Sequence, residues 1–288
     1  MARSVFDAPQ FQSEAAAFAY VEAHLWPTGA VCPHCGSTGA DVKRLAGKTT
    51  RLGLHKCYAC HGQFTVRQGS IFESSHLPLH LWLQVIHLMC ASKKGISTRQ
   101  IQRMLQCSMK TAWFLGHRIR AAMDNDQLGP FGSDGGFVEV DETFIGRDPE
   151  NRPAKDTQFG IHHMNKVVSL IDRDTGAAKS VVIDQVTAKE VWPVLAQNIS
   201  PDAVLMTDSS TVYRNLGENF RRHYAVDHSA GEYVRKSDPA IHTNTVEGSF
   251  SIFKRGMRGI YQHCSKKHLH RYTAEFDFRY SNRIAMGV

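Results

Sequence analysis

Two acidic residues lie where a carboxylate is costly. Asp141 lies inside the apolar run FVEVDETFIG, and Asp208 ends the apolar run AVLMTDSS. A carboxylate within or just beyond a buried strand is unfavourable unless a metal ion or a cation pairs with it. Asp208 has an alternative role as a cap of the following helix TVYRNL, whereas Asp141 has strand on both sides. Glu139 shares the face of Asp141 and Glu142 flanks it, so either could be the ligand instead.

A third acid lies on an amphipathic helix predicted within HTNTVEGSFSIFKRG, residues 242–256. An apolar stripe at helical spacing predicts the packed face, and it consists of Val246, Phe250, Phe253 and Met257. A neighbouring face carries an acid followed by bases, at Glu247, Ser251, Lys254 and Arg258. That order suits an acid that holds a metal and cations that hold phosphate. Asn244 and Glu247 also have the N-x-x-E form of a capping box, which explains them without chemistry.

Four of the seven cysteines form two C-x-x-C pairs. CPHC at 32–35 and CYAC at 57–60 are separated by 21 residues, close to the spacing of zinc sites with four thiolates. Gly36 and Gly62 follow the pairs, as such tight turns usually require. Cys32, Cys35, Cys57 and Cys60 would fill every ligand position, so the predicted zinc is structural and not catalytic. The unpaired Cys90, Cys107 and Cys264 are expected to be buried apolar residues.

A helix-turn-helix is predicted in ISTRQIQRMLQCSMKTAWFLGHRIRAAM. Ser108 would cap the second helix, which would bury Ala112, Leu115 and Ile119. The residues expected to face outward and contact DNA are Lys110, His117, Arg118 and Arg120. A basic second helix fits the major groove, although a small helical bundle with a solvated basic face has the same pattern.

The elements around these residues suggest an organisation in five parts. Residues 1–28 are a supporting helix, 29–70 a zinc ribbon, 71–125 the helix-turn-helix region, 126–136 a Gly-rich linker and 137–288 an α/β domain. FVEVDETFIG, KVVSLIDR and AKSVVIDQV are predicted strands, with the hairpin signal DRDTG between the last two. AVLMTDSS then begins an alternation with helices. A mixed sheet flanked by helices is therefore expected.

Composition favours a polyanionic partner. The 288 residues carry a formal charge of +7 with a pI near 9.1, and 42% of them are hydrophobic. The sequence shows neither a signal peptide nor a membrane span, which predicts a cytosolic protein without a membrane partner. In the cytosol, cysteines are more often thiols or metal ligands than disulfides.

These motifs together resemble the zinc-ribbon insertion-sequence transposases of family fifteen-ninety-five, with their D-D-E/N-K signature. The resemblance rests on VDETFIG, TDSS and HTNTVEGSFSIFKRG, preceded by the ribbon and the helical segment, and it covers residues 28 to 283. It implies a ribonuclease-H-like fold with Asp141 as first acid, Asp208 as second, Glu247 as third and Lys254 as the signature base. Some members use Asn as the third ligand, so Asn244 is the alternative. One departure is RDPENRPAKDTQFG, where a more basic Gly-rich segment is expected.

The resemblance also implies a mechanism. Two Mg²⁺ or Mn²⁺ ions about 3.5 to 4 Å apart, held by Asp141, Asp208 and Glu247, would activate water to cut DNA and then a 3′-hydroxyl to join it. Lys254 and Arg258 would hold backbone phosphate. The expected partners are the terminal repeats of the element and the target DNA, bound by a homo-oligomer in the nucleoid. A DNA-binding regulator and a stand-alone nuclease of the same fold are the alternatives.

Overall fold

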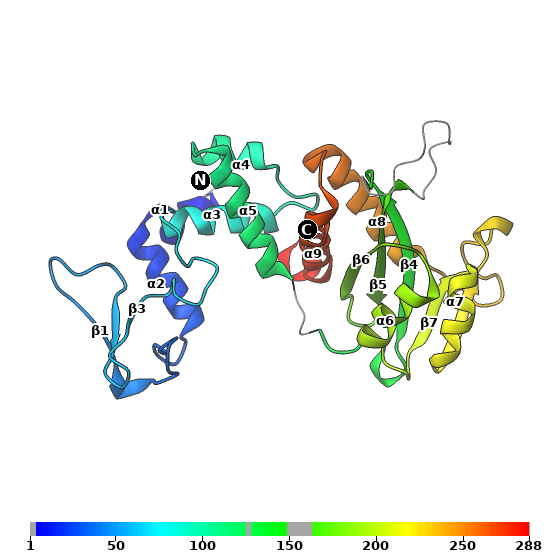
Figure 1. Ribbon diagram of the computed structural model, residues 1–288, viewed down its shortest axis with the longest axis horizontal. Helices are drawn as coiled ribbons and strands as arrows, with labels where there is room; N and C mark the ends of the chain where they lie inside the picture. Colours follow the sequence, from blue (N-terminus) through cyan, green and yellow to red (C-terminus); the bar gives the residue numbers. More distant parts are fainter. Residues whose placement is uncertain (1–3, 125–127, 149–162, 288) are drawn as a thin grey trace. The chain divides into compact units, whose positions relative to one another are not determined.

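The computed structural model describes residues 4–124, 128–148 and 163–287 (Figure 1). The chain forms two compact units. The first comprises Met1–Met89 and Thr98–Ile119, and the second comprises Cys90–Ser97 and Arg120–Val288. The ribbon and most of the helical region thus form one unit. The boundary at Ile119 and Arg120 falls within a helix.

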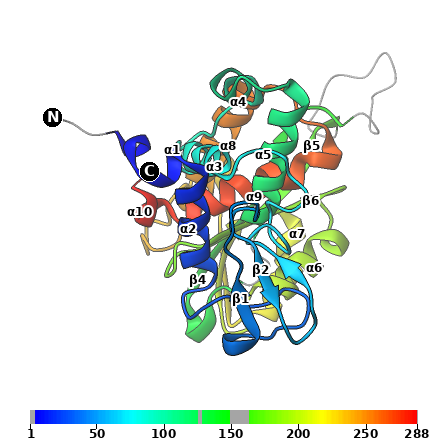
Figure 2. The same ribbon diagram turned by 90° about the vertical axis from the view of Figure 1, so that its left-hand side faces the viewer.

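The first unit contains a small ribbon and several helices. The ribbon is an antiparallel sheet in the order β1-β2-β3, with β1 at Val42–Arg44, β2 at His55–Cys57 and β3 at Gln63–Phe64. The helices are α1 (Pro9–Gln12), α2 (Glu14–Leu25), α3 (Leu79–Cys90), α4 (Thr98–Leu105) and α5 (Met109–Met123), of which α3 and α5 end in the second unit. Glu22 of α2 forms an ion pair with Arg44 at 2.9 Å, which ties α2 to β1 (Figure 2).

The apolar core of the ribbon is minimal. One cluster consists of Cys32, Cys57 and Phe64, with Trp26 and Val42 packed against them, and Leu54 and Val66 are also buried. So few apolar side chains cannot offset the entropy of ordering about forty residues. The ribbon therefore needs a further source of stability.

The second unit is built on a five-stranded mixed sheet in the order β6-β5-β4-β7-β8. Its strands are β4 (Phe137–Ile145), β5 (Asn165–Asp172), β6 (Ala178–Ile183), β7 (Val204–Asp208) and β8 (Arg222–Val226). The first three are antiparallel neighbours, whereas β7 runs parallel to β4 and β8 parallel to β7. This is the ribonuclease-H-like arrangement that the sequence predicts. The prediction missed β8, an edge strand in which only Val226 is fully buried.

Helices cover both faces of this sheet. Val138 and Val140 of β4 point to a core shared with α6 (Ala188–Asn198) and α7 (Thr211–Leu216). On the opposite face, Ile145 packs in a core shared with α8 (Asn244–Gly256) and α9 (Lys266–Ser281). Shorter elements are α10 (Arg283–Met286), a π-helical turn (Met257–Tyr261) and 3₁₀ turns at Val5–Asp7, Gly39–Asp41, Ser133–Gly135, Gly217–Asn219 and His228–Ala230.

The predicted linker 126–136 is a packed segment over its described part, residues 128–136. Phe131 is 3% exposed, and its amide donates to the carbonyl of Asn198 at 2.7 Å. The Gly132 amide donates to the Asp172 carboxylate at 2.9 Å. These bonds attach the segment to the sheet, so it cannot act as a free connection between units. Among the residues that the structure describes, every helix is too short or too polar to cross a lipid bilayer.

Candidate active site and zinc site

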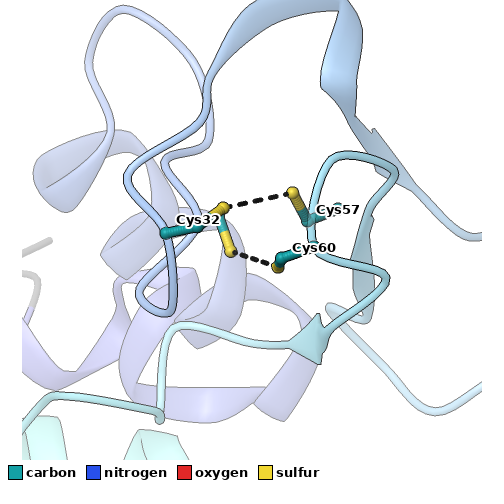
Figure 3. Close-up of side chains that lie close together, drawn as sticks. Cys32, Cys57 and Cys60 are labelled. Atoms are coloured by element: carbon teal, nitrogen blue, oxygen red, sulfur yellow. Dashed lines mark hydrogen bonds between the residues drawn. The ribbon is translucent and has the colours of Figure 1, made fainter.

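The four predicted cysteines converge in the first unit. The Sγ atoms of Cys32 and Cys60 are 3.7 Å apart, those of Cys35 and Cys57 are 3.6 Å apart, and all four lie within 4.8 Å of one another. Figure 3 shows Cys32, Cys57 and Cys60 directed toward one another. A tetrahedral zinc with bonds of about 2.3 Å places neighbouring sulfurs about 3.8 Å apart. The thiols therefore fit a structural zinc ion, which supplies the stability that the ribbon core lacks.

The turns of the two C-x-x-C pairs differ from each other. Gly36 has φ of +77°, as predicted for the first turn, but in the second turn the positive φ belongs to His61, at +61°. Gly62 is needed for space instead, because a Cβ there would lie 2.9 Å from the ring of His34. Hydrogen bonds with the Ser37 side chain and backbone lower the pKa of Cys35 to about 6, whereas the pKa of Cys60 is raised, despite a hydrogen bond with the Gly62 backbone, by its contact with Cys35 and by burial. The other three cysteines, Cys90, Cys107 and Cys264, are only half-buried.

Asp141 and Asp208 lie just beyond the paired part of two adjacent parallel strands. The pairing of β4 with β7 ends with Glu139 opposite Met206, and Asp141 and Asp208 each follow two residues after that last pair. Asp208 does not cap α7. Ser210 is the cap, since its Oγ accepts from the Val212 amide, and Asp208 Oδ1 accepts from the Ser210 amide at 3.1 Å. The stretch DSST therefore caps α7 as the sequence suggests, but through Ser210, while Asp208 supports the turn before it.

Electrostatics link the three predicted acids. Burial raises the pKa of Asp141 to about 8, and the charges of Glu142, Asp208 and Glu247 add to the shift. Neither Asp141 nor Asp208 forms an ion pair with a basic side chain of the described chain. Mutually repelling carboxylates without a cation are a donor set that fits a hard divalent ion.

The three acids are more widely spaced than the cysteines. In the described part of the chain, the cysteines are the only group of three or more ligand residues whose atoms all lie within 4.8 Å of one another. The Glu247 side chain is 36% exposed and is held at Oε1 by Thr243 Oγ1 at 3.0 Å and by His228 Nε2 at 3.1 Å. The position of Glu247 therefore depends on how the start of α8 is held.

Glu139 and Glu142, the alternative ligands, have other partners. Glu139 is fully buried and bonded to Arg173 and to the amide of Val246. Glu142 accepts a hydrogen bond from the buried Tyr213 hydroxyl at 2.5 Å, and burial raises the pKa of Glu142. Tyr213 interacts electrostatically with Asp141 and Asp208 as well, and this burial and these charges raise its pKa. Sequence patterns missed Tyr213, because an apolar position on a helix gives no sign of a polar contact.

The predicted capping box at the start of α8 does not form. The helix begins at Asn244 with Thr243 as its cap, and the Thr243 side chain donates to Glu247 instead of accepting from a helix amide. Asn244 is exposed and lines a 340 Å³ cavity bounded by α8, α9, β5 and β6. That cavity is lined by none of the three acids, Asp141, Asp208 and Glu247.

The predicted bases beyond Glu247 occupy two kinds of helix. Lys254 lies on α8, two turns after Glu247, with its Nζ 6.0 Å from the centre of the Phe250 ring. Arg258 is exposed on the π-helical turn.

The outward-facing residues predicted on α5 need two corrections. His117 is 2% exposed, and its ring centre lies 4.1 Å from that of Trp113 with the two planes tilted. Arg120 is completely buried in an ion pair with Glu275 of α9 at 2.7 Å. Lys110 is exposed as predicted. Arg118 is partly covered, because it donates to the carbonyl of Glu73 at 2.6 Å and its guanidinium lies over Trp82 and Phe114.

Two helices and a short turn occupy the segment in which a helix-turn-helix is predicted. A three-residue turn joins α4 and α5, the Ser108 Oγ accepts from the Thr111 amide at 3.1 Å, and the predicted interior residues are buried: Ala112, Leu115 and Ile119. Exposed arginines missed by the prediction, Arg99 and Arg103, lie on α4. The residues 149–162, which contain most of the atypical segment after VDETFIG, lie outside the described residues.

Comparisons with known proteins match both units. The model of the ISXO2-like transposase domain matches residues 135–281, just over half of the chain, and that of the transposase zinc-ribbon domain matches residues 12–63. A protein of Halobacterium salinarum, described as an uncharacterized protein in transposable element ISH50, is 27% identical over 271 residues, covering 88% of this chain and 86% of its own length.

Two solved structures also show similarity. One is the catalytic core domain of BIV integrase, 13% identical with a TM-score of 0.30, covering 49% of this chain and 81% of that chain. The other is a chain of the simian T-cell lymphotropic virus intasome in complex with PP2A regulatory subunit B56 gamma. It is 11% identical with a TM-score of 0.30, covering 62% of this chain and 67% of that chain.

Proposed function

The chain belongs to the ISXO2-like transposase family, and from this premise we propose that it cuts the ends of an insertion sequence and joins them to target DNA at a site formed by Asp141, Asp208 and Glu247. It is an enzyme of the DDE type. One observation carries the assignment of these residues. Asp141 and Asp208 each follow two residues after the last pair of the adjacent parallel strands β4 and β7, and the charges of Asp208 and of Glu247 from α8 act on the Asp141 carboxyl.

The three acids would provide oxygen ligands for Mg²⁺ or Mn²⁺. When bound, such ions supply Lewis-acid stabilisation of the phosphodiester and an activated water or 3′-hydroxyl nucleophile. Tyr213 restrains Glu142 beside this site. Lys254, two turns after Glu247 on α8, would contact the DNA phosphate, and Arg258 would contact phosphate from the following turn.

Glu247 is the preferred third ligand over Asn244. The charge of Glu247 contributes to the raised pKa of Asp141, whereas Asn244 is exposed and lines the cavity on the side of α9. Glu247 also keeps the seven-residue spacing to Lys254. We therefore expect an Asn244→Ala variant to remain active when Glu247 is present.

The first unit is proposed to recognise the terminal repeats. The ribbon, held by zinc, and the helix-turn-helix α4–α5 would contact DNA through Lys110 and through the partly covered Arg118, with Arg99 and Arg103 as further candidates. The active complex is proposed to contain more than one copy of the chain. We expect it in the cytoplasm, associated with the nucleoid.

Replacing Lys110 with alanine should weaken DNA binding without changing sequence preference. An exposed lysine that contacts phosphate releases about one counterion, so the slope of log affinity against log salt should fall by about one. Fluorescence anisotropy with terminal-repeat and unrelated duplexes at several salt concentrations measures this slope. Lys189→Ala on α6 serves as the control, and an unchanged slope for the Lys110 variant would remove this residue from the interface.

The overall activity is tested by incubating the full-length protein with terminal-repeat DNA, a target plasmid and Mg²⁺. We expect cleavage at the repeat end and covalent joining of its 3′ end to the plasmid, detected by gel electrophoresis and sequencing of junctions. Cleavage without joining would indicate a nuclease, and binding without cleavage would indicate a regulator. Either outcome contradicts the proposal.

A further inference from the structure

A buried glutamate connects the strand of Asp141 to the helix of Glu247. Glu139 lies two residues before Asp141 on β4, and its side chain is completely buried. Its Oε1 accepts from Arg173 Nε at 2.5 Å, and its Oε2 accepts from the backbone amide of Val246 at 2.9 Å. Val246 precedes Glu247, so one carboxylate bonds directly to the backbone beside the third acid.

The bond from Val246 replaces the missing cap of α8. The first amides of a helix have no partner within the helix, and a cap side chain usually accepts from the second or third of them. Here Thr243, the residue at the cap position, donates to Glu247 and leaves that acceptor role open. Glu139, 107 residues earlier in the chain, fills it and places a negative charge at the helix N-terminus, where the helix dipole favours it.

Arg173 fixes both the glutamate and the segment that leads into α8. Its Nη1 donates to the carbonyl of Ala240 and its Nη2 to the carbonyl of His242, each at 2.6 Å. The same Nη2 lies 2.9 Å from His242 Nδ1. His242 Nδ1 also lies 3.3 Å from Glu139 Oε1, so the imidazole contacts both the arginine and the glutamate. One arginine following β5 therefore bonds to Glu139 and to two backbone positions just before the helix.

We propose that Glu139, oriented by Arg173, is a positioning residue that sets the start of α8 so that Glu247 reaches the metal held by Asp141 and Asp208. This inference rests on the proposed function of the three acids. Glu139 does not touch the reacting atoms. Its effect passes through the Val246 amide to the neighbouring ligand, as partners of metal ligands commonly act.

The proposal is tested by direct Mn²⁺ binding to the full-length protein, measured by electron paramagnetic resonance of the free ion. Glu139→Gln keeps the size of the side chain but removes the charge that pairs with Arg173. We expect the Kd for Mn²⁺ to rise roughly tenfold to a hundredfold, the range found when partners of metal ligands are removed. The Mg²⁺ concentration for half-maximal cleavage should rise in parallel. The Asp208→Asn variant measures the background binding of Mn²⁺ outside the site of Asp141, Asp208 and Glu247.

Glu275→Gln is the matched control. Glu275 is equally buried and paired with arginines, but its bonding partners are Arg120, Tyr261 and Arg279. Both variants should melt at lower temperature, and only the Glu139 variant should bind Mn²⁺ more weakly. A purely structural role for Glu139 would lower the melting temperature and leave the Kd unchanged, which would overturn the proposal.

Arg173→Lys provides a second route if Glu139→Gln does not fold. Lysine keeps the charge but cannot donate to Glu139 and to both carbonyls at once, so the Kd should again rise. An unchanged Kd in this variant would equally overturn the proposal. If the wild type neither binds more Mn²⁺ than Asp208→Asn nor cleaves DNA, the proposed function itself fails. If the wild type does both and the two variants match it, only the positioning role fails.

Discussion

Replacing Asp141 with asparagine is expected to lower the rate of DNA strand cleavage by about a thousandfold or more and to leave the affinity for terminal-repeat DNA unchanged. A catalytic metal contributes several kcal/mol of transition-state stabilisation, and each 1.4 kcal/mol is about a factor of ten. Asparagine keeps the shape of Asp141 but lacks the charge that holds the metal. Cleavage of labelled repeat DNA and anisotropy with the same duplex measure the two effects.

The same substitution should stabilise the protein when no divalent metal is added. The pKa of Asp141 is raised from 3.8 to about 8, so between these values the folded state holds a proton that the unfolded state has released. The contribution of this proton to the free energy of unfolding is fully present below pH 3.8 and is lost as the pH rises toward 8. Asp141→Asn should therefore melt at higher temperature than the wild type at pH 8, with a smaller difference near pH 5. If the wild type and Asp141→Asn melt at the same temperature at pH 8, the raised pKa is contradicted.

Replacing Cys57 with serine is expected to remove zinc and to abolish recognition of the terminal repeats. The ribbon buries few apolar side chains, chiefly Cys32, Cys57, Phe64, Leu54 and Val66. Structural zinc contributes about 10 to 16 kcal/mol to the folding of such modules. Without that contribution the ribbon should unfold, because its burial cannot offset the entropy of ordering. Zinc content by mass spectrometry and hydrogen exchange of residues 30–66 measure the loss.

Cys107→Ser in the same unit is the control for this experiment. Cys107 is half-buried in the turn between α4 and α5 and lies outside the group of four thiols. The Cys107→Ser variant should retain the zinc ion and its affinity for terminal-repeat DNA. A Cys57 variant with full zinc content and unchanged repeat binding would contradict the structural role of the metal.

The sheet of the second unit could be predicted largely from sequence, because its buried strands are β-branched runs and its hairpin has a local signal. The Asp172 side chain accepts from the amides of Asp174 and Thr175, and Gly176 has φ of +71°, so the turn is determined by residues within it. The strand β8 has no such signal. The packed segment 128–136 was also missed, since its partners Asn198 and Asp172 are remote in sequence.

The same distinction applies to the site residues. The cysteines are recognisable because ligand spacing is a local property. The burial of Arg120 depends on Glu275, 155 residues away, so a helix pattern alone placed it on the surface. The start of α8 depends on Glu139, which local capping rules cannot identify. Asp141 and Asp208 were predicted because charges within apolar runs are unusual, and Glu247 because it shares a helix face with Lys254 and matches the family signature. Their partners required the fold.

The most direct test of the central claim is cleavage of terminal-repeat DNA in Mg²⁺ by three single variants, Asp141→Asn, Asp208→Asn and Glu247→Gln, each with its DNA affinity measured in parallel. Asn244→Ala serves as the comparison at the start of α8. The predicted result is loss of cleavage in all three acid variants with retained DNA binding and an active Asn244 variant. Cleavage at the wild-type rate in any one of the three acid variants would contradict the assignment of that acid, and cleavage in all three would contradict the site.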